Sequence, residues 1–162
     1  REIIFIPDRN LGQFVAAQVP DKTFWFFDGF CPTHNFIGPE EVEAIRREAP
    51  DAEILAHPEC RPEVLALVDF IGSTGQILRR AKESPNKKIV VCTEGGILHQ
   101  LRKDSPDKEF VLLSPNLVCT NMKKITLPLV LESLEEMEHR IEVPEDLRVL
   151  AVKALNRMLS YS

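Results

Sequence analysis

Short, uninterrupted apolar runs alternate with segments of helical periodicity along most of this chain, and this alternation limits the folds open to it. The apolar runs occupy residues 3–6, 24–27, 54–56, 70–71, 89–91 and 110–113. Because these runs are apolar at every position, we expect strands covered on both faces, as in a parallel sheet flanked by helices. Apolar residues recur at helical spacing in between, at 11–15, 64–68, 77–81 and 97–101. The pattern predicts an α/β fold of repeated βα units, with small parallel sheets in three-layer αβα sandwiches.

Two longer amphipathic segments close the chain. Residues 127–137 and 147–158 each carry apolar side chains on one helical stripe, which predicts two helices that pack against a core. Pro144 suits the first turn of the second helix, where its missing N–H costs nothing. Unit boundaries are expected near residues 50 and 115, which divides the chain into 1–50, 51–115 and 116–162.

Composition excludes several classes of protein. The chain has 162 residues and a formal charge of −5, so a nucleic-acid partner is not expected. No apolar run approaches the roughly 20 residues that span a bilayer, so we expect no membrane segment and a cytoplasmic protein. The four cysteines are widely separated, which argues against a disulfide framework. Since the sequence begins with Arg1 directly before an apolar run, we also expect that an N-terminal part is missing.

Polar clusters follow each apolar run directly. They are Asp8-Arg9-Asn10, residues 28–35, His57-Pro58-Glu59-Cys60, Gly72-Ser73-Thr74-Gly75, Thr93-Glu94-Gly95-Gly96, and residues 114–121 with Cys119. In open α/β sheets, ligands bind at the carboxyl ends of the strands, beside helix N-termini. We therefore expect several of these clusters to converge on one site.

A structural role is the simpler interpretation of some clusters. Asp8 and Asn10 can cap the helix that follows, Cys92 fits a buried thiol, and His99 lies within a helical segment. Residues 72–75 suit either a tight turn or the binding of a carboxylate or phosphate. The two clusters that pair cysteine with histidine, 31–34 and 57–60, favour chemistry more strongly, because they combine thiol, imidazole and carboxylate groups.

At these clusters the sequence resembles the bacterial and archaeal quinolinate synthases, iron–sulfur enzymes of de novo NAD biosynthesis. The matching stretches are residues 7–12, 29–34, 57–60, 72–76, 93–94 with 97–99, and Cys119 with 121–124. The family has three similar α/β units around a pseudo-threefold axis, with a 4Fe-4S cluster and the substrates at their junction. The resemblance implies that residues 1–50 complete the middle unit and 51–115 form the third. The C-terminal helices would then pack back on a first unit that this chain lacks.

The resemblance also implies a ligand set. Cys31 and Cys119 would be two of three cysteine ligands of the cluster, with one iron left open as a Lewis acid. The third cysteine, together with a histidine and a tyrosine of the active site, would come from the N-terminal unit. We therefore expect that the 162-residue chain alone is inactive.

The implied reaction condenses iminoaspartate with dihydroxyacetone phosphate to quinolinate, and it suggests a functional link to L-aspartate oxidase. His57, Pro58 and Glu59 would form part of the iminoaspartate site, with His57 on a substrate carboxylate and Glu59 placed for acid/base work. Ser73 and Thr74 would bind a carboxylate or phosphate from a helix N-terminus. His34 would lie near this pocket.

A different class of function is also open. Cys31, His34, His57 and Cys60 offer two ligand pairs with the spacing used in zinc sites, and together they could complete a structural Cys2His2 tetrahedron. A third interpretation is a degenerate α/β domain with only a binding role. Metal analysis separates the first two, since iron with labile sulfide favours the enzyme and stoichiometric zinc favours the module.

Overall fold

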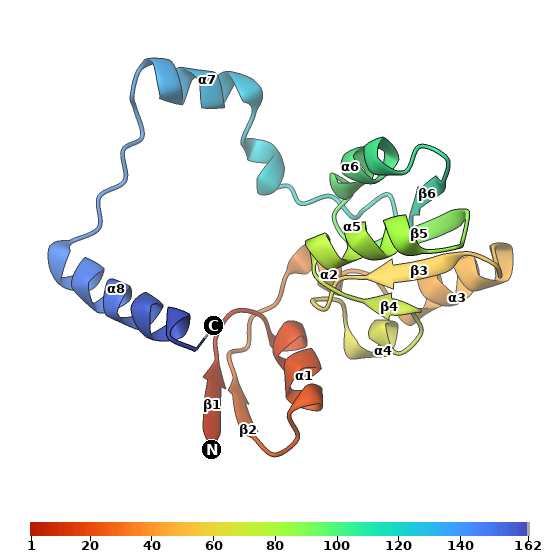
Figure 1. The fold of residues 1–162 in the computed structure, drawn as a ribbon, viewed down its shortest axis with the longest axis horizontal. Helices are drawn as coiled ribbons and strands as arrows, with labels where there is room; N and C mark the ends of the chain where they lie inside the picture. Colours follow the sequence, from red (N-terminus) through yellow and green to blue (C-terminus); the bar gives the residue numbers. More distant parts are fainter. Residues whose placement is uncertain (162) are drawn as a thin grey trace. The chain divides into compact units, whose positions relative to one another are not determined.

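Strands and helices alternate from the first residues onward in the computed structural model, which describes residues 1–161 (Figure 1). The chain forms two compact units, Arg1–Cys119 and a second that begins at Thr120. All strands of the described residues lie in two small parallel sheets, of two and four strands. The expected α/β class is thereby confirmed.

The first sheet consists of two parallel strands and one crossing helix. Strand β1 (Glu2–Phe5) pairs with β2 (Thr23–Phe26), and α1 (Arg9–Gln18) connects them. A Cβ atom at Gly12 would lie only 2.7 Å from the Phe26 ring and 2.8 Å from the Phe5 ring. Glycine at this position therefore lets α1 approach the strands closely.

The second sheet contains β4 (Phe70–Ile71), β3 (Glu53–Ala56), β5 (Lys88–Cys92) and β6 (Glu109–Leu112), in that spatial order. Helix α4 (Pro62–Leu65) connects β3 to β4, α5 (Thr74–Glu83) connects β4 to β5, and α6 (Ile97–Asp104) connects β5 to β6. The chain thus proceeds from β3 toward one edge and from β5 toward the other. The carboxyl ends of β3 and β5 form the topological switch point, where ligands bind in such sheets.

Helices cover both faces of the second sheet, as the apolar strand pattern predicts. On one face, Ile54 and Val90 pack with Val42 of α3 (Pro39–Glu48) and Val64 of α4. On the other face, a second cluster joins the remaining strand residues to α5 and α6: Leu55, Ile89, Val91, Phe110, Ile77, Ala81, Ile97 and Leu101. Helix α3 and the short α2 (Pro32–Asn35) were not among the helices expected from the periodicity.

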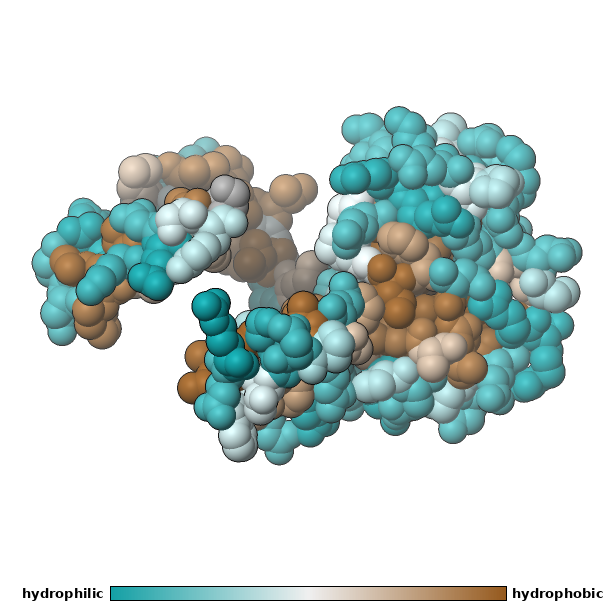
Figure 2. Space-filling view, turned by 60° about the horizontal axis from the view of Figure 1, so that its bottom comes forward, coloured by the Kyte–Doolittle hydropathy of each residue, from teal (hydrophilic) through white to brown (hydrophobic). Residues whose placement is uncertain are grey.

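The first sheet differs from the expectation of two covered faces. Ile4 is 76% exposed and Trp25 59% exposed, and Ile6 and Phe27 are exposed as well. Helix α1 packs on these strands, but in the described residues nothing buries the outward side chains. The continuous apolar pattern predicts burial on both sides. The prediction of the two strands is confirmed, but the expected burial of their outward faces is not observed in the described residues. Figure 2 shows hydrophobic residues, in brown, at the surface on one face of the molecule.

The second unit contains a 3-10 turn, Met122–Lys124, and the two expected helices, α7 (Leu127–Glu135) and α8 (Glu145–Leu159). Thr126 caps α7 by accepting a hydrogen bond from the Leu129 N–H. Neither helix has a buried residue in the described structure, so the expected core packing of their apolar stripes is not observed there. Their packing onto another α/β unit stays a prediction. None of the described helices is long and apolar enough to cross a membrane.

Candidate functional site

The site lies at the switch point between β3 and β5, where each strand ends in a polar residue. His57 directly follows β3, and Thr93 directly follows β5. The His57 N–H donates to the Cys92 carbonyl at 3.2 Å, which continues the sheet pairing for one more residue. The register of the sheet therefore brings these two polar ends side by side.

Cys31 and His34 come from the preceding segment, on either side of the first turn of α2. Pro32 starts this helix with a pre-set φ, and Cys31 precedes it in an extended conformation. The Cys31 N–H donates to Asp8 Oδ2 at 2.7 Å, while Asp8 Oδ1 accepts from the Leu11 N–H at 2.8 Å. Asp8 is thus the expected helix cap, and it also fixes the backbone of Cys31.

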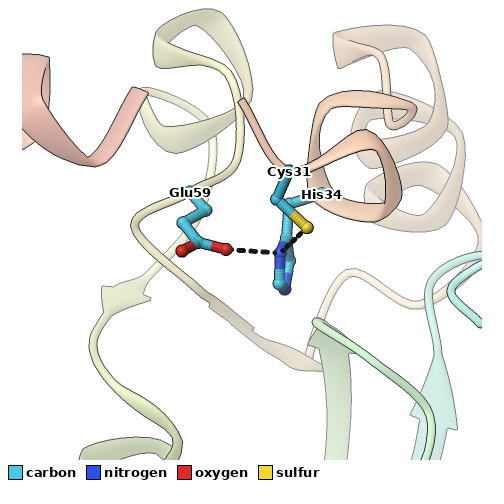
Figure 3. A group of neighbouring side chains, drawn as sticks. All are labelled: Cys31, His34 and Glu59. Carbon is cyan, nitrogen blue, oxygen red and sulfur yellow. Dashed lines mark hydrogen bonds and ion pairs between the residues drawn. The ribbon is translucent and has the colours of Figure 1, made fainter. Parts of the chain in front are cut away.

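Three atoms that can each bind a metal, a sulfur, a nitrogen and an oxygen, converge at this point (Figure 3). His34 Nδ1 lies 3.2 Å from Cys31 Sγ and 3.0 Å from Glu59 Oε2. All three atoms lie within 4.8 Å of one another. The other ring nitrogen of His34, Nε2, lies 2.9 Å from the hydroxyl of Thr93. His34 is therefore held on both sides of its ring.

The second histidine stacks on the first. The rings of His34 and His57 are 4.7 Å apart and nearly parallel, and His57 Nδ1 lies 3.7 Å from Glu59 Oε2. His57 Nδ1 accepts the Glu59 N–H at 3.3 Å, so a neutral His57 carries its proton on Nε2. A carboxylate only accepts, so a neutral His34 carries its proton on Nδ1, facing Glu59, and accepts the Thr93 hydroxyl at Nε2.

Burial controls the charges of these groups. It lowers the pKa of His34 below the ordinary 6.5, and the nearby His57 adds to this effect. Burial likewise lowers the pKa of His57. Both rings are therefore neutral at pH 7. Burial raises the pKa of the Cys31 thiol above its ordinary 9.0, and the charge of Glu59 acts in the same direction.

Asn10 connects the site to the first sheet. Its side-chain amide donates to Asn35 Oδ1 and to the Glu59 carbonyl, each at 3.0 Å. The residue is buried and has no role as a helix cap, in contrast to the sequence interpretation. The sequence shows only a polar residue in the first turn of the helix that Asp8 caps. Many helices begin in this way, so the contact of Asn10 with the Glu59 loop could not be predicted.

The remaining predicted residues lie in the segments that follow the strands of the second sheet. Pro58 is buried between His57 and Glu59. Cys119 is partly exposed, and its N–H donates to Glu94 Oε1 at 3.4 Å, so it lies next to the residue that follows Thr93. Ser73 and Thr74 are exposed where α5 begins, after β4, and the Ser73 N–H donates to Gln76 Oε1.

The four residues of the zinc alternative do not converge. Cys60 is fully buried in the core beside α3 and α4, and its Sγ donates to the Cys92 carbonyl at 3.4 Å. Burial raises the pKa of this thiol to about 12, in keeping with its place in the core. In the described part of the chain, the metal-competent group consists of Cys31, His34 and Glu59 and includes neither His57 nor Cys60. The pattern of residue types could not separate a core thiol from a ligand.

Comparison with known proteins places this chain in a family. Residues 1–160 match the family described as Quinolinate synthetase A protein. The chain is 50% identical to the quinolinate synthase of Geobacter metallireducens over 160 residues, which is 99% of this chain and 52% of that protein. It is 47% identical to quinolinate synthase 2 of Methanosarcina acetivorans over 162 residues, again 52% of the relative. The chain spans about half the length of the curated relatives it matches. We conclude that this chain belongs to the quinolinate synthetase A family.

Proposed function

We propose that the chain is part of an enzyme that condenses iminoaspartate with dihydroxyacetone phosphate. The products are quinolinate, one phosphate and two waters. Family membership supports the proposal, as do the relatives that carry the name quinolinate synthase. The observation that carries it is the pairing of two neutral histidines with one carboxylate at the switch point of the sheet. A cytoplasmic location stays a prediction.

His57 suits the binding of a substrate carboxylate. Its neutral ring accepts the Glu59 N–H at Nδ1 and so presents an Nε2–H donor. The Nε2–H of a neutral imidazole can orient a substrate carboxylate by a hydrogen bond, and it does not compete with Glu59 as an acid. Pro58 restricts the backbone between His57 and Glu59, which keeps the donor and the carboxylate in a fixed relation.

Glu59 suits the proton transfers of the condensation and the two dehydrations. Its side chain is 25% exposed, so a ligand can reach it, and Oε2 lies 3.0 Å from His34 Nδ1. Because the His34 N–H fixes this oxygen, the carboxylate meets a substrate C–H or N–H in one orientation. We propose that Glu59 is the acid/base residue and that His34 orients it.

Ser73 and Thr74 would bind the phosphate or a carboxylate. They lie at the N-terminus of the ten-residue helix α5, where free backbone N–H groups and the helix dipole favour an anion. Both residues are exposed and follow β4, which pairs with β3.

The thiols fit the iron–sulfur cluster that the family uses. Of the four free cysteines, Cys31 and Cys119 are partly exposed, while Cys60 and Cys92 are buried. Accessible thiols suit a cluster ligand, so Cys31 and Cys119 would hold it together with a third cysteine outside this chain. When bound, a cluster with one open iron supplies a Lewis acid for substrate oxygen.

The test is an anaerobic assay for quinolinate with Glu59→Gln and His57→Asn variants of the full-length protein after reconstitution with iron and sulfide. Loss of the acid/base group lowers turnover by about 10²- to 10⁴-fold. His99→Asn, on the exposed face of α6, is the matched control and retains activity. Full activity of Glu59→Gln would contradict the assigned role, and absence of quinolinate from the unaltered full-length protein would contradict the proposed function.

A further inference from the structure

The three donor atoms of Cys31, His34 and Glu59 form a ligand set that needs no second thiol. They are a sulfur, an imidazole nitrogen and a carboxylate oxygen, and all lie within 4.8 Å of one another. Cations of intermediate softness, above all Zn²⁺, bind this mixture of donors. Sites of this kind with three protein ligands keep a fourth position for water or a substrate.

Two of the distances between the donor atoms are close to those around a tetrahedral cation. Zinc bond lengths place sulfur and nitrogen ligands about 3.6 Å apart, and nitrogen and oxygen ligands about 3.4 Å apart. The corresponding separations here are 3.2 Å from Cys31 Sγ to His34 Nδ1 and 3.0 Å from His34 Nδ1 to Glu59 Oε2. At these two pairs the cation requires a widening of about 0.4 Å, which the partly exposed Cys31 and Glu59 side chains can supply, and Cys31 Sγ lies within 4.8 Å of the Glu59 carboxylate.

Thr93 completes the arrangement. A histidine that binds metal through one ring nitrogen donates its other N–H to a nearby acceptor, and this contact fixes the ring. For His34 that partner is the Thr93 hydroxyl, 2.9 Å from Nε2, and Thr93 is buried. The hydroxyl donates to Nε2 while the proton is on Nδ1, and it accepts from Nε2–H once the cation occupies Nδ1. Thr93 therefore satisfies the ring in both forms.

We propose that Cys31 Sγ, His34 Nδ1 and Glu59 Oε2 bind a single divalent cation of the zinc type, with one coordination position open. Neither Cys119 nor Cys60 belongs to this site. Cys60 Sγ lies in the core and donates to the Cys92 carbonyl, and the group of converging donors does not include Cys119. Under the proposed function, Cys31 is also a cluster ligand, so a single cation and the cluster exclude each other. That exclusion rests on the proposed function, whereas the cation site does not.

The experiment uses Co²⁺ as a spectroscopic substitute for Zn²⁺, added under anaerobic conditions to the metal-free protein. We expect one Co²⁺ per chain, a thiolate-to-cobalt charge-transfer band, and loss of the band on addition of Zn²⁺. Cys31→Ser abolishes the band, and Glu59→Gln weakens Co²⁺ binding. Circular dichroism verifies that each variant is folded. A band that survives Cys31→Ser would overturn the proposal.

Two further variants separate the cation site from its alternatives. Cys119→Ser retains the cobalt band but loses the iron–sulfur absorption after reconstitution; loss of the cobalt band in this variant would overturn the proposal. Thr93→Val weakens Co²⁺ binding by about 10- to 100-fold, the usual effect of removing the partner of a ligating histidine, while Thr93→Ser restores it. Failure of cluster reconstitution in the unaltered full-length protein would contradict the proposed function and leave the cation site intact.

Discussion

Replacing Thr93 by valine tests the hydrogen bond that fixes His34. Valine has nearly the shape of threonine, so the change removes the hydroxyl and little else. Thr93 is 4% exposed and His34 7% exposed, so water cannot take the place of the lost partner. A buried acceptor left without a donor costs about 1–3 kcal/mol. The equilibrium constant for unfolding then rises by about 5- to 150-fold.

The measurement is urea unfolding followed by circular dichroism, with Thr93→Ser as the control. Serine keeps the hydroxyl and removes a methyl group, which costs about 1 kcal/mol of apolar burial. The ¹⁵N resonances of the His34 ring give a second readout. They change in Thr93→Val, because Nε2 loses its hydrogen bond, and stay near the unaltered values in Thr93→Ser.

If the Thr93 hydroxyl makes no hydrogen bond, the two substitutions change the free energy of unfolding differently. A hydroxyl without a partner is better replaced by a methyl group in a buried position. Thr93→Val would then be as stable as the unaltered protein or more so, while Thr93→Ser would still lose stability. That result, with unchanged His34 resonances, would refute the assigned hydrogen bond.

Three further predictions concern the fold and the thiols. Leu55→Ala removes a fully buried side chain from the second sheet and lowers the free energy of unfolding by about 2–5 kcal/mol, measured in urea. Arg80→Met leaves the buried Glu53 carboxylate without its ion pair and lowers the free energy of unfolding by about 1–3 kcal/mol, measured in the same way. Iodoacetamide modifies Cys119 in the folded protein, whereas Cys60, with a pKa raised to about 12, reacts only after unfolding, as mass spectrometry of the peptides will show.

The sequence predicted the strands better than their environment. The runs at 54–56 and 89–91 became the buried centre of a sheet, because hydrophobicity at every position reports burial on two faces. The run at 3–6 carries the same signal, yet Ile4 is exposed. The apolar pattern shows that a strand needs cover on both faces. It does not identify the part of the protein that provides this cover.

The convergence of the site could be predicted in outline. Parallel strands end at one edge, so the polar residues after them had to lie near one another. The identity of the contacts could not be predicted, because they join residues distant in sequence, such as His34 with Thr93 and Asn10 with Glu59. For Cys60, a position beside Glu59 suggested a ligand, but the backbone turns its thiol into the core.

The N-terminus of α1 holds both loops of the site at once. Asp8 accepts from the Cys31 backbone, and two residues later Asn10 donates to the Glu59 carbonyl. Because Asp8 and Asn10 lie in the same helix turn, the distance between the loop of Cys31 and the loop of Glu59 is set by that turn. The first turn of α1 thus acts as a spacer between two loops that are separate in the sequence.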